Sequence, residues 1–285
     1  MLKIADRALA ASASKVLASI QATVDGAADY SGRVTAADVE WKAKGGTAAK
    51  KDAFKLIRET LASMCVGPVR CAYCEDSLAD EVEHIQPKSL FPQHAFVWTN
   101  YLFACGPCNG PKSNRYGVVT GNAVVEFVRQ RGGPISAPPA GTSGFIDPRR
   151  EDPSGLLEVD LGGTTPSGDV IAGTFEILPA DGLSPTDFAR ADFTIEVLGL
   201  NREVIRVARA NAFGGFRARM REFVHKLEGG ADADALLALK NDLLMTPHLT
   251  VFSEIRRQRA ILPELNDLLQ RAPDMLAWDL VPGAA

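Results

Sequence analysis

Two pairs of closely spaced cysteines are the residues of this sequence best suited to metal chemistry. Cys71 and Cys74 form one CxxC pair, and Cys105 and Cys108 form the other. Each pair places two thiolates on a tight turn, and two such turns complete a tetrahedral four-cysteine zinc site. Four protein ligands leave no position for water or substrate, so the zinc is expected to be structural and to contribute to folding. Catalysis, if present, must come from other residues.

Polar residues between and after the cysteine pairs could supply that catalysis. Residues 82–88 read VEHIQPK, residues 98–102 read WTNYL, and Asn109 directly follows the fourth cysteine. The imidazole of His84 is a candidate general base because it titrates near neutral pH. Glu83 would lie on the opposite face of a strand from His84, and a carboxylate suits a hard divalent cation.

The order of these motifs resembles that of HNH endonucleases. The combination of CxxC, EHxxPK and WxNxLxxCxxCNGPK is similar to the branch found in Septu-type and retron-associated antiphage defence systems. The later segments IDPRREDP at 146–153 and TIEVLGLNREVIRVAR at 194–209 are similar to the distal part of the same branch. The resemblance covers roughly residues 67–210. It implies a ββα-metal fold and hydrolysis of nucleic-acid phosphodiester bonds, with DNA the favoured substrate.

The resemblance also assigns roles to four residues. His84 would be the general base that activates water, and Asn100 would hold the loop that orients it. Glu83 and Asn109 would be the protein ligands of a catalytic Mg²⁺. Many HNH sites carry a second histidine where Asn109 stands, and this departure favours Mg²⁺ or Mn²⁺ over a softer catalytic metal.

Substrate and partner contacts are implied as well. Lys112, Lys88 and Arg115 could bind phosphates of the nucleic acid. Nucleases of this branch typically work beside an ABC or SMC-like ATPase, so such a partner subunit is expected here.

Two other functions fit the same motifs. A four-cysteine module is more often a structural or binding element, so a catalytically silent zinc module that binds nucleic acid or a protein partner is the first alternative. A zinc ribbon without catalytic activity does not require an acid–His pair between its two cysteine pairs. The presence of Glu83 and His84 there favours the nuclease. The second alternative is an HNH effector that cleaves RNA or tRNA. The catalytic residues contact only a phosphate, and the surrounding surface determines whether DNA or RNA binds.

Composition sets limits on these functions. The chain has 285 residues and a net charge of −4, so contact with a polyanion would depend on local basic patches. Arginines cluster at residues 202–221 and 256–259, and a solvated helix face is the preferred interpretation of each cluster. No apolar run approaches the roughly 20 residues of a spanning helix, and no secretory pattern opens the chain, so a cytoplasmic protein without a membrane partner is expected. Cys65, the fifth cysteine, is expected to be a buried small hydrophobe.

The expected elements give an α+β protein whose zinc-braced ββα-metal core is embedded among helices. Residues 1–66 form a helical N-terminal region, with Thr35 and Asp38 as a helix cap and Gly45–Gly46 as an interruption. Residues 67–118 form the HNH module. Residues 119–200 form a linker and short strands at 156–161 and 171–178, and residues 201–285 form a helical C-terminal region in which Asn201 caps the first helix. These regions are expected to pack as one unit.

Overall fold

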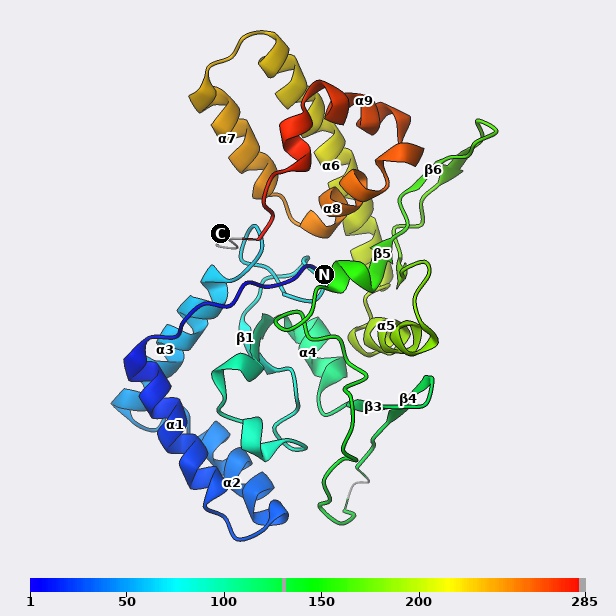
Figure 1. The fold of residues 1–285 in the computed structure, drawn as a ribbon. Coiled ribbons are helices and arrows are strands. Elements are labelled where there is room, and N and C mark those ends of the chain that lie inside the picture. The colour runs from blue at the N-terminus through cyan, green and yellow to red at the C-terminus, as the bar shows by residue number, and fades with distance from the viewer. Residues whose placement is uncertain (130–131, 282–285) are drawn as a thin grey trace.

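The computed structural model describes residues 1–129 and 132–281 (Figure 1). Its helices are α1 (Ala11–Asp25), α2 (Tyr30–Lys42), α3 (Ala48–Ser63), α4 (Gly106–Lys112), α5 (Pro185–Leu198), α6 (Glu203–Glu228), α7 (Ala233–Leu244), α8 (Leu249–Arg257) and α9 (Pro263–Arg271). Its strands are β1 (Glu81–His84), β2 (Tyr101–Ala104), β3 (Gly117–Thr120), β4 (Ala123–Glu126), β5 (Leu157–Val159), β6 (Gly162–Thr164), β7 (Val170–Ala172) and β8 (Ile177–Pro179). Helices combined with small antiparallel sheets confirm the predicted α+β class.

The first three helices pack together at the N-terminal end of the chain, the blue part of Figure 1. The predicted cap at Thr35 and Asp38 is wrong, because α2 begins five residues earlier. Asp29 is its N-cap and accepts a hydrogen bond from the Gly32 amide at 2.7 Å. Thr35 instead donates to a carbonyl one turn back within the helix. The predicted interruption at Gly45–Gly46 is confirmed by the break between α2 and α3.

Two short strands and a short helix form the centre of the molecule. β1 and β2 pair antiparallel, with Glu81 opposite Ala104 and His84 opposite Tyr101. Alternation along β1 gives Glu81 and Glu83 one face of the strand and His84 the other. Helix α4 follows β2 after a single residue and packs against β1. The order strand, strand, helix therefore surrounds the predicted site residues.

The segment between the central unit and α5 consists of three small antiparallel pairs, β3–β4, β5–β8 and β6–β7. The single strand predicted at 171–178 is wrong, because it is divided between β7 and β8. Phe175 has a φ of +57°, which no regular strand accommodates, and the chain changes direction there. Residues 132–144 of the predicted linker are mostly irregular, whereas residues 130–131 lie outside the described part of the chain.

The C-terminal helices α6–α9 pack around aromatic and aliphatic side chains such as Phe216 and Phe252, whose rings stack at 5.4 Å. A continuous cluster of buried apolar residues joins this core to the central unit and to α1 and α3. The capping role expected of Asn201 is wrong. Its side chain bonds both the amide and the carbonyl of Ile177 at 2.7 and 2.8 Å, so it ties the start of α6 to β8.

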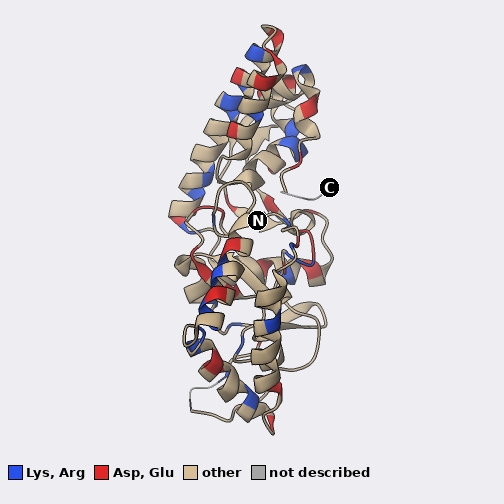
Figure 2. Ribbon diagram, turned by 90° about the vertical axis from the view of Figure 1, so that its left-hand side faces the viewer, with Lys and Arg blue, Asp and Glu red and all other residues tan. Residues whose placement is uncertain are grey.

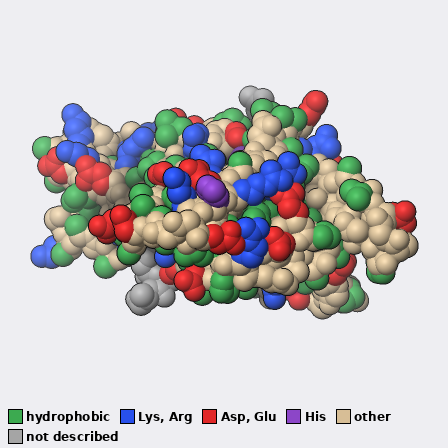
Figure 3. All heavy atoms as spheres, turned by 90° about the horizontal axis from the view of Figure 1, so that it is seen from above, with side chains coloured by type: hydrophobic (Ala, Val, Ile, Leu, Met, Phe, Trp, Pro, Cys, Tyr) green, Lys and Arg blue, Asp and Glu red, His purple; other side chains and the backbone are tan. Residues whose placement is uncertain are grey.

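Charged side chains of both signs are interspersed along the whole molecule (Figure 2). Several arginines of both clusters form ion pairs: Arg206 pairs with Glu176, Arg217 and Arg221 share Glu264, and Arg257 pairs with Glu158 and Glu254. In Figure 3, which looks down onto the C-terminal helices, Lys and Arg side chains (blue) lie next to Asp and Glu side chains (red). The prediction of a solvated helix face is wrong for Arg209, which is buried and donates to the Leu200 carbonyl at 2.7 Å. Within the described residues, no helix has the length and apolar character needed to cross a membrane.

Candidate metal centre and active site

The four cysteines of the two CxxC pairs converge in one buried cluster. Their sulfur atoms all lie within 4.8 Å of one another, and those of Cys74 and Cys105 are 3.8 Å apart. Zinc–sulfur bonds of about 2.3 Å in a tetrahedron place the sulfurs about 3.8 Å apart, so the cluster has the dimensions of a zinc site. The hydrogen bond with Cys105 lowers the pKa of Cys74 and raises that of Cys71, so the thiols of the cluster compete for protons.

Local backbone geometry explains how each pair forms its turn. After the first pair, Glu75 has a φ of +60° and its amide donates to the Cys71 carbonyl at 2.9 Å, which closes a tight knuckle. The second pair lies at the start of α4, where Cys105 is the N-cap and the Cys108 amide donates to its carbonyl at 3.1 Å. Each knuckle therefore aims two sulfurs at one point.

An arginine from the C-terminal region contacts this cluster. Arg202, the N-cap residue of α6, donates to the Cys108 sulfur at 3.4 Å and also contacts the Pro107 carbonyl. Burial lowers the pKa of Arg202, but the hydrogen bond to Cys108 and the charge of the cysteines raise it overall. Four thiolates around Zn²⁺ carry a net charge of −2, so a guanidinium beside one of them offsets part of that charge. Sequence patterning placed Arg202 only on a helix face and gave no indication of this contact.

His84, the predicted base, lies at the end of β1 with 7% of its surface exposed. Its Nε2 lies 2.9 Å from the carbonyl oxygen of Ala95. A carbonyl can only accept, so Nε2 carries the proton and Nδ1 of the neutral ring holds a free lone pair. The Trp41 ring from α2 packs against the imidazole at 4.4 Å. Burial lowers the pKa of His84 to about 3, against the raising effect of the Ala95 bond, so the ring is neutral at physiological pH.

Asn100 holds the loop that carries the Ala95 carbonyl. Its Oδ1 accepts from the Gln86 amide at 2.8 Å, and its Nδ2 donates to the carbonyls of Gln86 and His94 at 3.0 and 2.9 Å. One side chain thus joins the two ends of the segment between β1 and β2. Because Ala95 directly follows His94, this bracing also fixes the orientation of the His84 ring. Asn100 therefore braces this loop in the structure, and its role in catalysis stays a prediction.

Glu83 and Asn109, the predicted magnesium ligands, lie on the facing elements β1 and α4. Glu83 is buried and contacts the ammonium group of Lys112, which also donates to the His84 carbonyl at 2.8 Å. Burial raises the pKa of Glu83 overall, against the lowering effect of Lys112, so its charged form depends on that lysine. Asn109 donates through Nδ2 to the Glu81 carboxylate at 2.6 Å. The side chains of Glu83 and Asn109 are therefore each engaged with a different partner.

Two charged residues near the site, Glu81 and Arg149, were not predicted from the sequence. Glu81 shares its strand face with Glu83, and the alternation in EVEH would have indicated this. Arg149, from the segment 146–153, is buried and donates to the carbonyls of Trp98 and Tyr101 at 2.7 and 2.8 Å. It therefore braces the chain on both sides of Asn100. No local signal distinguished this arginine from its neighbour Arg150.

The three predicted phosphate contacts differ in their surroundings. Lys112 is fully buried against Glu83. Lys88 is half-buried near His84, with Nζ 5.9 Å from the centre of the Trp41 ring. Arg115 forms two hydrogen bonds with Glu126 and a third with Glu196, at 2.7 to 2.9 Å. Its charge is thus balanced by two carboxylates, which weakens its case as a phosphate contact.

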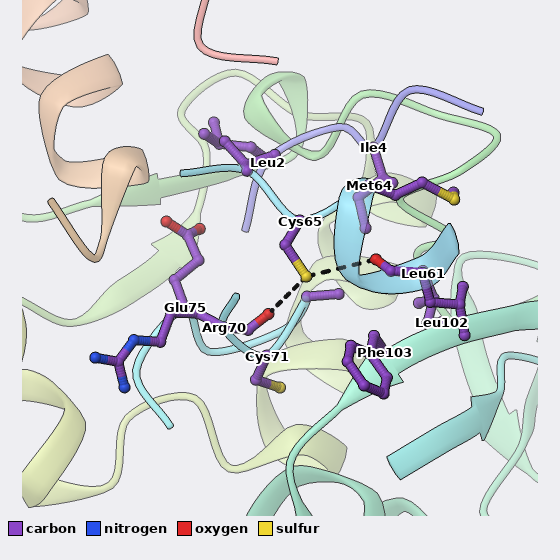
Figure 4. Close-up of a pocket in the computed structure, with 12 residues that line it drawn as sticks. Leu2, Ile4, Leu61, Met64, Cys65, Arg70, Cys71, Glu75, Leu102 and Phe103 are labelled. Atoms are coloured by element: carbon purple, nitrogen blue, oxygen red, sulfur yellow. Dashed lines mark hydrogen bonds between the residues drawn. The ribbon is translucent and has the colours of Figure 1, made fainter. Parts of the chain in front are cut away.

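Cys65 has the buried position expected of it. Its thiol donates to the carbonyls of Leu61 and Arg70 at 3.6 and 3.4 Å (Figure 4). Burial raises its pKa to about 11, so the thiol remains protonated and unreactive at physiological pH. The cavity that it lines measures about 20 Å³, which is room for about one water molecule.

Comparisons with protein-family models, with curated proteins and with solved structures find no match to this chain.

Proposed function

We propose that this protein is a metal-dependent HNH endonuclease that hydrolyses phosphodiester bonds of nucleic acid, with DNA the favoured substrate. The observation that carries the proposal is the support given to His84. Asn100 braces the segment between β1 and β2, the Ala95 carbonyl of that segment fixes the proton on Nε2, and Nδ1 is left as the basic nitrogen. A silent zinc module does not require an imidazole that is held in one tautomer.

The surrounding fold supports the same proposal. The order β1, β2, α4, with the base on the first strand and an asparagine at the start of the helix, agrees with the ββα-metal arrangement that the resemblance implies. The four-cysteine cluster would hold a structural Zn²⁺ that fixes the start of α4 relative to β1. The zinc would then act on catalysis only through the position of this helix.

Proton transfer at His84 is the step that this chain performs itself. The Nδ1 lone pair would accept a proton from the attacking water, whose oxygen forms the new bond to phosphorus while the ester oxygen leaves. The resulting imidazolium would be stabilised through its Nε2–H bond to the Ala95 carbonyl. Because the pKa of His84 is low in the free protein, contact with the anionic phosphate would have to raise it for efficient transfer.

Oxygen donors on the face of β1 opposite His84 would suit a hard catalytic cation. Glu83, Glu81 and the amide oxygen of Asn109 lie on the facing sides of β1 and α4, and such donors suit Mg²⁺ or Mn²⁺. A bound cation would stabilise charge on the phosphate and on the leaving oxygen. Lys112 contacts one oxygen of the Glu83 carboxylate, so a cation bound to this group would share it with the lysine or displace the lysine.

The packing of Trp41 over His84 also supports the regulation of nuclease activity by a partner protein. With Trp41 packed on the imidazole and little of the ring exposed, a phosphodiester needs a rearrangement of α2 to reach Nδ1. A partner such as an ABC or SMC-like ATPase would supply that rearrangement. We therefore expect the isolated chain to cut slowly and a co-encoded partner to increase the rate.

The experiment incubates the purified protein with plasmid DNA and, separately, with total RNA, in Mg²⁺, Mn²⁺ or EDTA, with and without co-encoded proteins. His84→Ala protein, purified in the same way, controls for contaminating nucleases. Metal-dependent cutting of DNA that the variant lacks supports the proposal. Cutting of RNA alone would change the substrate to RNA, and equal behaviour of the two proteins would leave a binding module.

A further inference from the structure

Two lysines beside the predicted base have no carboxylate partner. Lys44 lies just past the end of α2, with Nζ 4.8 Å from the centre of the Trp41 ring. Lys88, in the segment after β1, has Nζ 5.9 Å from the same ring centre. Within the described residues neither lysine has an acidic oxygen within 4.0 Å, whereas Lys42 pairs with Asp38 at 2.7 Å. Trp41 thus contacts two ammonium groups that form no ion pair with the described residues.

The same tryptophan places these charges next to the candidate active site. The Trp41 ring lies 4.4 Å from the His84 ring, so both ammonium groups stand one aromatic ring away from the imidazole. Their field reaches it, because both lysines lower the pKa of His84 in addition to the effect of burial. The positive charge is therefore directed at the place where a phosphate would have to bind.

The ammonium groups of Lys44 and Lys88 repel each other when no anion is bound near them. Burial lowers the pKa of Lys88, and Lys44 and Lys42 lower it further, while Asp38 and Glu83 oppose them. An anion bound close to these ammonium groups would reduce this repulsion. A phosphodiester backbone offers such an anion and also brings a scissile bond to the adjacent base.

We propose that Lys44 and Lys88, positioned by Trp41, bind the phosphodiester backbone of the nucleic-acid substrate beside His84. The inference rests on the proposed nuclease function and extends its substrate site beyond the central strands and α4 to the N-terminal helices. Lys44 belongs to a region in which the motifs assign no functional residue. Trp41 of α2 therefore covers the base, and Lys44, just past the end of that helix, supplies one of the substrate contacts.

The test measures binding of a fluorescent DNA duplex by anisotropy in EDTA, where cleavage is suppressed, across about 50 to 200 mM salt. Lys44→Gln should weaken binding several-fold and reduce the slope of log K against log salt by about 1, and Lys44→Gln/Lys88→Gln should reduce it by about 2. Lys51→Gln on α3 removes the same charge from an exposed lysine and is the matched control, expected to leave both quantities unchanged. Thermal unfolding verifies that all variants remain folded.

The possible failures are distinguishable. If Lys44→Gln binds DNA like Lys51→Gln while the wild type still cuts, the lysine assignment is wrong and the nuclease function stands. If the wild type binds neither this duplex nor a single-stranded RNA at low salt and cuts neither polymer, both proposals are overturned. A loss of affinity in Lys44→Gln with RNA alone would keep the phosphate contact and assign RNA as the substrate.

Discussion

The ammonium group of Lys112 lies against the carboxylate of Glu83, and the two side chains are only 1% and 5% exposed. This ion pair joins α4 to β1 and occupies the carboxylate that the resemblance implies as a metal ligand. Removing one member of a buried ion pair typically costs about 3–5 kcal/mol, because the other charge remains buried without a partner.

A double-mutant cycle on this pair should show strong coupling. Lys112→Met and Glu83→Gln should each lower the free energy of unfolding by about 3–5 kcal/mol, whereas the double variant should lose clearly less than the sum. Urea denaturation with all four proteins measures the coupling. Additive losses would show that the two groups do not interact in solution.

Magnesium should act differently on the wild type and on Lys112→Met. In the variant burial keeps Glu83 protonated until a cation binds in place of the ammonium group, so Mg²⁺ bound there should raise the melting temperature more than in the wild type. Thermal unfolding with increasing Mg²⁺ measures the difference, and Glu83→Gln/Lys112→Met is the control that lacks the carboxylate. The same shift in the control as in Lys112→Met would remove Glu83 from the metal ligands.

The four-cysteine cluster should retain one zinc ion per chain through dialysis. Elemental analysis of purified protein tests this stoichiometry. Cys71→Ser should abolish retention and destabilise the central unit, because zinc binding contributes folding free energy. Cys65→Ser is the matched control, since Cys65 lies outside the cluster. Equal zinc content in both variants would refute the assignment.

Arg202 should slow the release of that zinc. Arg202→Met removes the hydrogen bond to Cys108 and the positive charge beside the thiolates, so zinc affinity should fall by about 10-fold or more. Transfer of zinc to a chromogenic chelator follows the release. Arg206→Met, one turn further along α6 and paired with Glu176, is the control. Identical release from both variants would mean that the Arg202 contact does not influence the metal.

The imidazole of His84 should remain neutral well below the usual histidine range. Because its pKa is lowered to about 3 in the folded protein, its proton NMR signal should not shift between pH 8 and pH 5. Below about pH 6.5 the unfolded chain binds a proton at this position and the folded chain does not, so this residue makes stability fall as pH decreases. Acidification from pH 7.5 to 5 should therefore cost the wild type more stability than His84→Ala. A titration midpoint near 6.5 would show that the ring is solvated.

The parts of the site that sequence motifs could predict are those built by neighbouring residues. The CxxC pairs, the acid–His alternation on β1 and the asparagine at the start of α4 depend on local geometry. The α+β class followed from the periodicity of apolar residues. The same local reasoning failed for the cap of α2, where Asp29 and Thr35 are both good capping residues and tertiary packing selects the first.

The remaining parts of the site depend on contacts between distant segments. Trp41 contacts His84 across 43 positions of the chain, and Arg202 contacts Cys108 across 94. Neither residue type nor spacing distinguishes these two residues from other tryptophans and arginines. Only the packing of α2 and α6 against the central strands brings them to the site.

Single-turnover cleavage of the preferred polymer by the wild type and His84→Ala, in saturating metal, tests the central claim most directly. His225→Ala, on α6, removes a histidine outside the site and is the matched control. If His84 is the general base, its loss should slow cleavage by about 10²- to 10⁴-fold with substrate affinity preserved, while the control cuts like the wild type. Cleavage by His84→Ala at the wild-type rate would contradict the account.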